Sequence, residues 1–498
     1  MVVFFLNQQN RMQTQISNTL PANTQALIIA VAQSDGLKDQ MKQIADAHGL
    51  SATFIESEFA AKHKEVLPLV AASAKVYLVG LGKDPKMADC IAAMRSFAYR
   101  FKGKLPDNTV LNLNYLPQPT LAEGLLNGFF LGDYEVGIYK TDIAEANDFF
   151  AKDTAQLTVL VEQQAMQKTT ELCTRARAMA DTQQQVMQLG NAPANHKTPK
   201  MLGEWASQSG QKYGFDVKVF DQDTCKNIGL EALLAVGAGS RNEPVFIVME
   251  YKHPDATEKI GLVGKGVTFD TGGISIKQSA NMHLMKSDMG GAAAVFGALE
   301  MAAKLQLPVH LIGIVPSCEN SVDGLATKPS EVMGSYSGKT IEMIDTDAEG
   351  RLILADGLAY LVRNYSPDVM IDLATLTGSC VATLGYAAAG MFTNNADLSA
   401  ELYSAGQLAG EKLWPLPLWE DYQYMLKSDV ADLKNHSGLP VAGAISAAKF
   451  LEVFTENHPA WAHLDIAGTA FTDSEFASMK SASGFGVRLL VDWIAGRR

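Results

Sequence analysis

The chain has few cysteines for its length, and none is placed to form a disulfide framework. Its 498 residues include five cysteines, an odd and widely spaced set without a Cys-X-X-Cys pair. Small secreted scaffolds depend instead on closely spaced, paired cysteines. The pattern indicates reduced, buried thiols in a cytoplasmic protein, namely Cys90, Cys173, Cys225, Cys318 and Cys380.

Long apolar runs are also missing. No uncharged stretch approaches the roughly 20 residues that a helix needs to cross a bilayer, so we expect no membrane partner. Residues 1–6 (MVVFFL) are apolar but lack the basic segment and the length of a signal peptide. We interpret them as a first β-strand.

Positive charge is in deficit. The 41 lysines and arginines face 54 acidic residues, which gives a net charge of −13 at pH 7. Nucleic acids and anionic membranes attract basic surfaces, so neither is expected as the main partner. Hydrophobic residues at 47% and charged residues at 19% are typical of a globular protein. The length predicts two domains.

The first third of the chain has the pattern of a small α/β domain, which we assign to residues 1–164. Apolar runs of strand length alternate with helical spacing: strands at 26–32, 75–81 and 157–162, and a helix at 87–102. Gly80-Leu81-Gly82 lacks the third glycine of a dinucleotide-binding motif, so we interpret it as a strand-to-helix turn.

A polar, glutamine-rich segment without proline predicts a linking helix over residues 165–190, and the larger catalytic domain follows at 191–498. Alternating strands and helices predict a mostly parallel sheet covered by helices. In such sheets ligands bind at the carboxyl ends of strands. The expected strands are 246–251, 259–263, 311–315 and 369–373, and the expected helices are 290–304 and 352–363.

Acidic residues concentrate in the heptapeptide 345–351 (DTDAEGR). Asp347 and Glu349 are two residues apart, so in an extended segment they point to the same side. Two ionised carboxylates in a cleft are costly unless cations neutralise them. Asp270, before a Gly-Gly pair, and Asp288 add two further oxygen ligands, which together suit two divalent metals. No histidine or cysteine joins these motifs, so manganese, magnesium or zinc is favoured over copper or iron–sulfur chemistry.

The motifs at 264–273, 275–277, 287–291 and 345–351, with the C-terminal stretch 461–468, resemble the leucyl aminopeptidase family of dinuclear metallo-exopeptidases. The resemblance is close from residue 190 onward and weak in the first third. Where that family usually has asparagine this chain has Asp345, so we expect an extra negative charge beside the metals.

The resemblance implies five metal ligands for two divalent ions, Mn²⁺ or Zn²⁺: Lys265, Asp270, Asp288, Asp347 and Glu349. Asp270 and Glu349 would bridge both ions. Lys265 is unusual, because an amine coordinates a metal only after its pKa has fallen by about 3 units, which an adjacent dication can supply. The residues alone would make Lys265 a counter-ion to the acids.

The resemblance further implies catalytic roles for Lys277, which would stabilise the oxyanion, and for Arg351, which would hold a bicarbonate ion as general base. It implies a substrate pocket of mainly apolar character that receives a leucine-like first residue. The pocket residues would be Met282, Thr375, Leu376 and Gly378. The resemblance also implies that the substrates are short peptides with a free N-terminus and that the protein is a cytoplasmic homohexamer. It implies that a water shared between the two metals attacks the peptide bond.

Simpler interpretations stay open for several residues. Asp270 alone could be a turn aspartate and Asp288 a helix N-cap. His283 is expected on the surface or in a pocket wall, and His463 in a structural hydrogen bond. Two other functions compete: a DNA-binding regulator with secondary peptidase activity, and another two-metal amidohydrolase or phosphatase. Sites of the latter kind usually contain several histidines.

Overall fold

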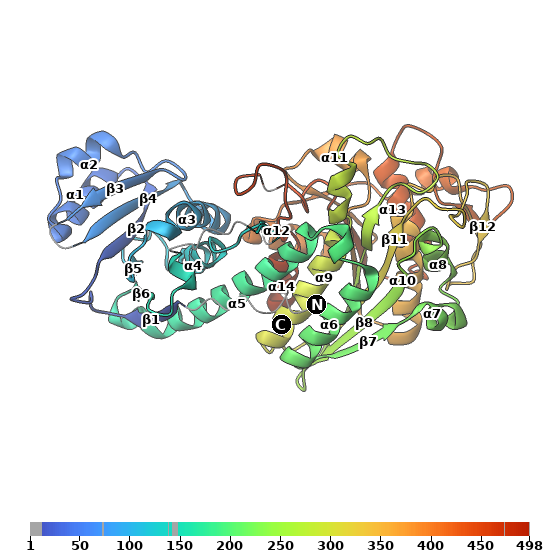
Figure 1. Ribbon diagram of the computed structural model, residues 1–498, viewed down its shortest axis with the longest axis horizontal. Helices are drawn as coiled ribbons and strands as arrows, with labels where there is room; N and C mark the ends of the chain where they lie inside the picture. Colours follow the sequence, from blue (N-terminus) through green and yellow to red (C-terminus); the bar gives the residue numbers. More distant parts are fainter. Residues whose placement is uncertain (1–11, 72–73, 138, 142–147, 473, 498) are drawn as a thin grey trace. The chain divides into compact units, whose positions relative to one another are not determined.

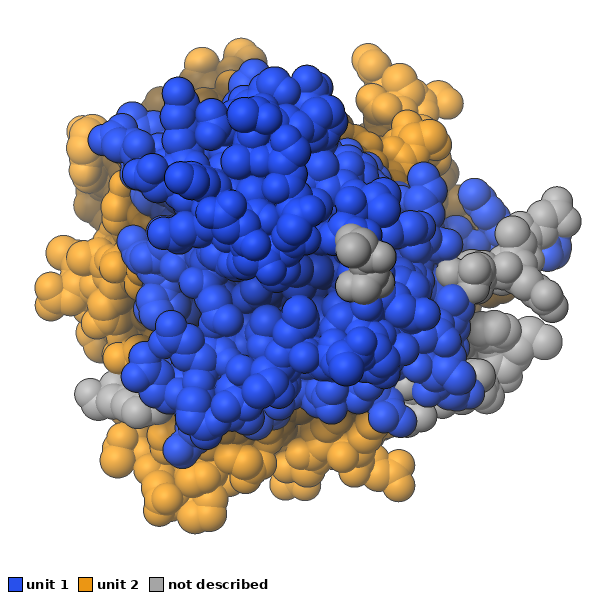
Figure 2. Space-filling model, turned by 90° about the vertical axis from the view of Figure 1, so that its left-hand side faces the viewer, with its two compact units in different colours: residues 1, 3–184 blue, residues 2, 185–498 orange. Residues whose placement is uncertain are grey.

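The computed structural model describes residues 12–71, 74–137, 139–141, 148–472 and 474–497 (Figure 1). It divides the chain into two compact units, and the division between Gln184 and Gln185 falls inside helix α5 (Met166–Asn191) (Figure 2). The helix predicted over 165–190 is therefore present. The limits of the two functional domains stay a prediction, and the strand expected at 1–6 lies outside the described residues.

The first unit is built on a six-stranded sheet in the order β1-β6-β5-β2-β4-β3, in which only β3 runs antiparallel to its neighbour. The strands are β1 (Gln13–Ser17), β2 (Ala26–Gln33), β3 (Val66–Val70), β4 (Lys75–Lys83), β5 (Asn108–Asn112) and β6 (Gln156–Leu160). The helices are α1 (Leu37–His48), α2 (Ala52–Glu58), α3 (Met87–Phe101) and α4 (Ala122–Leu131).

Strand β2 is buried along almost its whole length because helices cover both faces of this sheet. Leu27 and Ile29 pack with α1 and α2, whereas Ile28 and Ala30 face the core formed with α3 and α4. One expectation was wrong. Gly80-Leu81-Gly82 lies inside β4, where the register with β2 shifts by one residue, so the segment is a β-bulge and not a turn into a helix.

The second unit contains a nine-stranded sheet, ordered β16-β15-β18-β14-β9-β11-β8-β7 with β10 beside β11, and a small sheet β12-β13-β17. The large sheet comprises β7 (Asp216–Phe220), β8 (Val245–Lys252), β9 (Lys259–Gly264), β10 (Gly266–Asp270), β11 (His310–Asn320), β14 (Val369–Ala374), β15 (Ala389–Thr393), β16 (Leu413–Pro415) and β18 (Trp461–Asp465). The small sheet comprises β12 (Val332–Met333), β13 (Ile341–Glu342) and β17 (Leu433–Lys434).

Helices cover both faces of the central parallel strands β18, β14, β9 and β11, as the sequence predicted. Figure 1 shows α9 and α10 on opposite sides of them, and Gly261 of β9 accordingly faces α10 whereas Gly264 faces α9. The helices are α6 (Pro199–Tyr213), α7 (Gln222–Ile228), α8 (Glu231–Gly237), α9 (Gly290–Lys304), α10 (Gly350–Tyr365), α11 (Gly378–Leu384), α12 (Ala396–Ala409), α13 (Gly443–Val453) and α14 (Val487–Gly496). Within the described part of the chain, no helix is both long and apolar enough to cross a membrane.

The end of β9 approaches the first turn of α9 closely enough to require glycine. A Cβ atom on Gly264 would lie 2.6 Å from the carbonyl oxygen of Gly291 and 2.8 Å from Ala292 Cα. The approach holds the next residue on both sides: the Lys265 N–H donates to Leu373 O at 3.0 Å, and the Ala292 N–H donates to Lys265 O at 2.9 Å. Backbone packing thus fixes where Lys265 leaves the sheet.

Replacing Gly264 with alanine should lower the free energy of unfolding by about 2 kcal/mol, because the added methyl group meets backbone atoms that cannot rotate away. Urea unfolding of Gly264→Ala and wild type measures the difference. Gly324→Ala is the matched control, since an added Cβ there has no neighbour within 4 Å. Equal stability of the two variants would contradict the close approach.

Candidate active site

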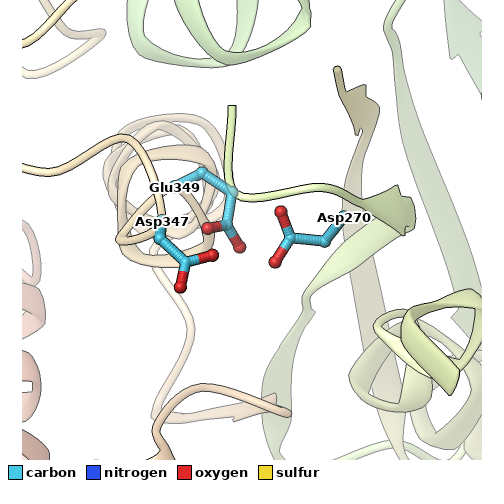
Figure 3. Close-up of side chains that lie close together, drawn as sticks. All are labelled: Asp270, Asp347 and Glu349. Carbon is cyan, nitrogen blue, oxygen red and sulfur yellow. The ribbon is translucent and has the colours of Figure 1, made fainter. Parts of the chain in front are cut away.

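Three carboxylates from two segments of the chain converge at the carboxyl end of the large sheet (Figure 3). Asp270 is the last residue of β10, Asp347 lies in the loop before α10, and Glu349 is the N-cap residue of α10. One oxygen atom from each lies within 4.8 Å of the other two. Asp270 and Glu349 are buried, whereas 34% of the Asp347 side chain stays exposed. These are three of the four acids that the sequence predicted, and the fourth, Asp288, is connected to Glu349 through Lys265.

Lys265 lies against the buried side of the cluster. Its Nζ is 2.7 Å from Asp288 Oδ2 and 2.9 Å from Glu349 Oε1, and it donates to Thr375 O at 3.1 Å. Burial alone would lower the pKa of this lysine, but Asp288, Glu349 and Asp270 outweigh it and raise the pKa. In the ammonium form Lys265 therefore acts as a counter-ion, which is the role that the residues alone suggested.

Lys277 lies against the open side of the cluster. Its Nζ is 2.8 Å from Asp270 Oδ2 and also pairs with Asp347, while 22% of its side chain stays exposed. Burial opposes the charge, yet Asp270, Glu349 and Asp347 together raise the pKa of Lys277. The lysine is thus a fixed positive charge at the entrance to the acids.

The acids outnumber the lysines, and their pKa values reflect it. Burial first, and then repulsion by Asp270, raises the pKa of Asp347 to about 7 and raises that of Glu349. Burial likewise raises the pKa of Asp288 to about 7, although Lys265 opposes this. Glu349 Oε2 is buried without a hydrogen-bond partner among the described residues. Buried carboxylate oxygens with excess negative charge fit hard divalent cations.

Asn320 orients Asp270. Asp270 Oδ1 accepts hydrogen bonds from Asn320 Nδ2 and from the N–H of Gly272, both at 2.8 Å. The turn after β10 passes through Gly272 at φ +86°, a conformation that favours glycine. Asn320 Nδ2 also donates to Thr346 O at 3.1 Å, which ties Asp270 to the acidic loop. Asn320 is the last residue of β11, and nothing in its local sequence marks it as part of the site.

The acidic loop is a turn, so the expected extended geometry of Asp347 and Glu349 was wrong. Asp345 Oδ1 accepts the N–H of Asp347 at 2.9 Å, which is an Asx turn. An asparagine oxygen could accept the same bond. Asp345 is not in the three-acid cluster, and its negative charge instead opposes, together with that of Glu349, the lowering of the Arg351 pKa by burial. The extra charge therefore lies toward the arginine.

Asn435 holds this loop together from 90 residues away in the sequence. Its Oδ1 accepts the N–H of Ile344 at 2.8 Å, its Nδ2 donates to Asp345 O at 2.6 Å, and its backbone oxygen accepts Arg351 Nη1 at 2.8 Å. Arg351 is buried, and its Nε has no hydrogen-bond partner among the described residues. Burial lowers the pKa of Arg351 to about 10, although the nearby charge of Glu349 opposes this. Among the described residues, no ion pair joins Arg351 to an acid.

The predicted substrate residues are only partly brought together. Thr375 contacts the fourth predicted acid, because its hydroxyl donates to Asp288 Oδ1 at 2.7 Å. Leu376 is half-buried against the core, Met282 is half-buried at the start of the 3₁₀ helix η6 (Met282–Ser287), and Gly378 is exposed. Neither Met282 nor Gly378 bonds to the acids among the described residues.

Three smaller expectations concern Asp288 and two histidines. Asp288 is not a helix N-cap, since Met289 occupies that position of α9 without a side-chain bond. His463 is held in a buried hydrogen bond, with Nδ1 at 2.6 Å from Asp372 Oδ1, as expected of a structural histidine. His283 is exposed on the surface.

Comparison with known proteins identifies the family. The catalytic domain of the cytosol aminopeptidase family matches residues 184–491. A probable cytosol aminopeptidase of Chloroherpeton thalassium is 40% identical, covering 93% of this chain and 96% of that protein, and one of Rickettsia canadensis is 37% identical, covering 95% and 97%.

Two solved structures share the fold over nearly the whole chain. A lysine-to-glutamate mutant of tomato leucine aminopeptidase superposes with a TM-score of 0.85 at 31% identity and covers 98% of this chain and 97% of its own. The bottromycin maturation enzyme BotP in complex with Mn has a TM-score of 0.81 at 30% identity and covers 95% and 99%. The chain therefore belongs to the cytosol aminopeptidase family, and it is an aminopeptidase, a peptide hydrolase that depends on divalent metal.

Proposed function

We propose that the protein removes hydrophobic, leucine-like residues from the N-terminus of short peptides with the help of two divalent ions. The convergence of four carboxylates around Lys265 and Lys277 is the observation that carries this proposal. Such a pair of ions, Mn²⁺ or Zn²⁺, would supply Lewis-acid activation of a shared water and of the scissile carbonyl. The Mn-bound structural relative supports manganese.

The proposed ligands are Lys265, Asp270, Asp288, Asp347 and Glu349. Gly350 supports the inclusion of Lys265, because a Cβ atom there would lie 2.5 Å from Lys265 Cε and 2.7 Å from its Nζ. Only glycine at the start of α10 leaves room for the lysine beside Glu349. Lys265 would bind metal as a neutral amine. This requires that metal ions take the place of its ion pairs with Asp288 and Glu349 and lower its pKa.

Lys277 and Arg351 would take different parts in the reaction. Lys277, half-buried with its charge held at the cluster, would hold the negative charge that develops on the carbonyl oxygen. Arg351, buried with an unpaired Nε, would hold a planar anion such as bicarbonate as general base. Because Lys277 and Arg351 contact different partners, removing the Lys277 side chain should not have the same effect as removing that of Arg351.

The peptide would lie along Met282, Thr375, Leu376 and Gly378, whose mainly apolar character supports a hydrophobic first residue. A neutral α-amine is a good ligand for a metal with an open position, so the free N-terminus would place the first peptide bond at the acids. A homohexamer and a cytoplasmic location stay predictions from the family resemblance.

Metal removal and pH test the site together. Chelation should abolish hydrolysis of a leucyl peptide, and Mn²⁺ should restore it. Because the pKa values of Asp347 and Asp288 lie at about 7 without metal, protons should compete with the ion at lower pH. Mn²⁺ affinity of the metal-free protein, measured by calorimetry, should fall at least ~10-fold between about pH 8 and about pH 6. Full activity of protein shown to be metal-free by elemental analysis would contradict the mechanism.

Substitutions should separate ligands from the oxyanion residue. Asp347→Asn and Glu349→Gln each remove a proposed ligand and should lower both metal content and turnover. Lys277→Ala should keep metal content at or above the wild-type level while kcat falls by about 10²-fold, as for loss of an oxyanion donor. Lys328→Ala is the control, because this exposed lysine forms an ion pair with Glu331 away from the acids. An emptied metal site in Lys277→Ala would show that its assigned role is wrong.

Exopeptidase specificity should require the free α-amine. Acetylation of the N-terminus removes the lone pair from coordination and adds bulk, so kcat/KM for an N-acetyl-leucyl peptide should be on the order of 10³-fold lower than for the free peptide. Both substrates are compared at equal concentration with Mn²⁺-loaded enzyme. Similar rates would indicate an endopeptidase or amidase on the same scaffold.

A further inference from the structure

Asp465, the last residue of β18, is fully buried outside the proposed metal and catalytic set. No lysine, arginine or histidine of the described residues forms an ion pair with it. Its negative charge nevertheless favours the protonated forms of Arg351 and His463, although burial still lowers the pKa of Arg351 and Asp372 is the larger cause of the raised pKa of His463. A buried carboxylate without a cationic partner must be stabilised by hydrogen bonds.

Three of the four hydrogen bonds to its carboxylate come from Leu376 and Thr377, in the short segment 375–377. Asp465 Oδ1 accepts the backbone N–H of Leu376 at 3.2 Å and of Thr377 at 3.4 Å, and Oδ2 accepts the Thr377 hydroxyl at 2.6 Å. The same Oδ1 also accepts the N–H of Ala467 at 3.2 Å. The Thr377 oxygen in turn accepts the Cys380 N–H at 3.0 Å and so begins α11.

Strand register places the carboxylate where this segment leaves the sheet. Strands β14 and β18 are parallel neighbours, and Ala374 is the register partner of Asp465. The Ile466 N–H donates to Ala374 O at 2.8 Å, which fixes the two strand ends together. Asp465 therefore meets the chain at the first residues beyond β14.

The other end of the same segment contacts Lys265 and Asp288 beside the acid cluster. Thr375 O accepts Lys265 Nζ, and the Thr375 hydroxyl donates to Asp288. Because Asp465 takes the N–H groups of Leu376 and Thr377, Leu376 offers a peptide only its side chain and its carbonyl oxygen. That oxygen accepts no hydrogen bond from the described residues.

We propose that Asp465 is a positioning residue for peptide binding: its carboxylate shapes residues 375–377 so that Leu376 can receive the substrate, an inference that rests on the proposed function. It does not touch the substrate or the metals. Its loss should therefore weaken peptide binding more than it slows the chemical step, and it should leave the metal content unchanged.

Steady-state kinetics with L-leucyl-p-nitroanilide tests the proposal on the full-length, Mn²⁺-loaded enzyme. Wild type that does not hydrolyse this substrate would refute the proposed function itself. With active wild type, Asp465→Ala should raise KM by about 10-fold while kcat changes less than about 3-fold. Metal content per chain, by elemental analysis, should match wild type. An unchanged KM, or a loss of metal that accounts for the whole defect, would overturn the proposal.

Asp465→Asn should rescue KM to within about 3-fold of wild type. Its amide oxygen can still accept the three N–H groups, and the Thr377 hydroxyl can turn to accept from the amide nitrogen. Rescue would assign the effect to hydrogen bonding, whereas a KM as high as that of the alanine variant would overturn this mechanism.

Asp356→Ala is the control for general destabilisation. Asp356 is equally buried on α10 and accepts the N–H of Leu233 at 2.9 Å and of Tyr336 at 2.8 Å, so its loss should lower Tm without raising KM. A KM increase as large as that of Asp465→Ala would overturn the assignment. If Asp465→Ala fails to fold, Thr377→Val is compared with Thr377→Ser. Only the valine variant loses the hydroxyl bond to Asp465, so equal KM values would refute the proposal.

Discussion

The repulsion among four carboxylates at one end of a sheet is the constraint on which the rest of the catalytic unit depends. Burial and mutual repulsion raise the pKa values of Asp288, Asp347 and Glu349. Lys265 compensates on the buried side and Lys277 on the open side. The fold must hold the carboxylates together although their mutual repulsion would separate them in water. In a member of this family, divalent metal ions neutralise the remaining negative charge.

The scaffold meets this constraint with strand ends and small residues. Lys265 directly follows β9 and Asp270 ends β10, so the strand ends fix the backbone positions of both residues. Gly264 lets α9 approach, and Gly350 leaves space for the Lys265 side chain. A Cβ atom at Gly264 would meet the backbone of α9, and one at Gly350 would meet the end of the Lys265 side chain. The rigid sheet thus places the charges, and the loops at its carboxyl edge adjust their orientation.

Polar residues outside the acidic motifs determine that orientation. Asn320 turns Asp270 toward the acidic loop, and Asn435 holds that loop beside Arg351. Asp465 holds the segment beyond β14 in the same way, through hydrogen bonds from Leu376 and Thr377. Each is buried, and each satisfies backbone groups that would otherwise be left without partners. A site of this kind therefore extends well beyond the groups that touch metal or substrate.

The sequence by itself determined the fold class and the chemistry of the site. Apolar runs of strand length between helical segments predicted the parallel sheet, and β9, β14 and α9 lie where those runs are. The crowding of Asp347 and Glu349 predicted a demand for cations, because that demand depends on residue type and number.

Tertiary structure decided what depends on distance in space. It made the acidic loop a turn rather than an extended segment, and it turned Gly80-Leu81-Gly82 into a bulge. It also brought Asn320, Asn435 and Asp465 to the site from 50, 90 and 88 residues away along the chain. Local sequence carries no trace of such contacts, since a buried amide or carboxylate is recognised only by the partners that surround it.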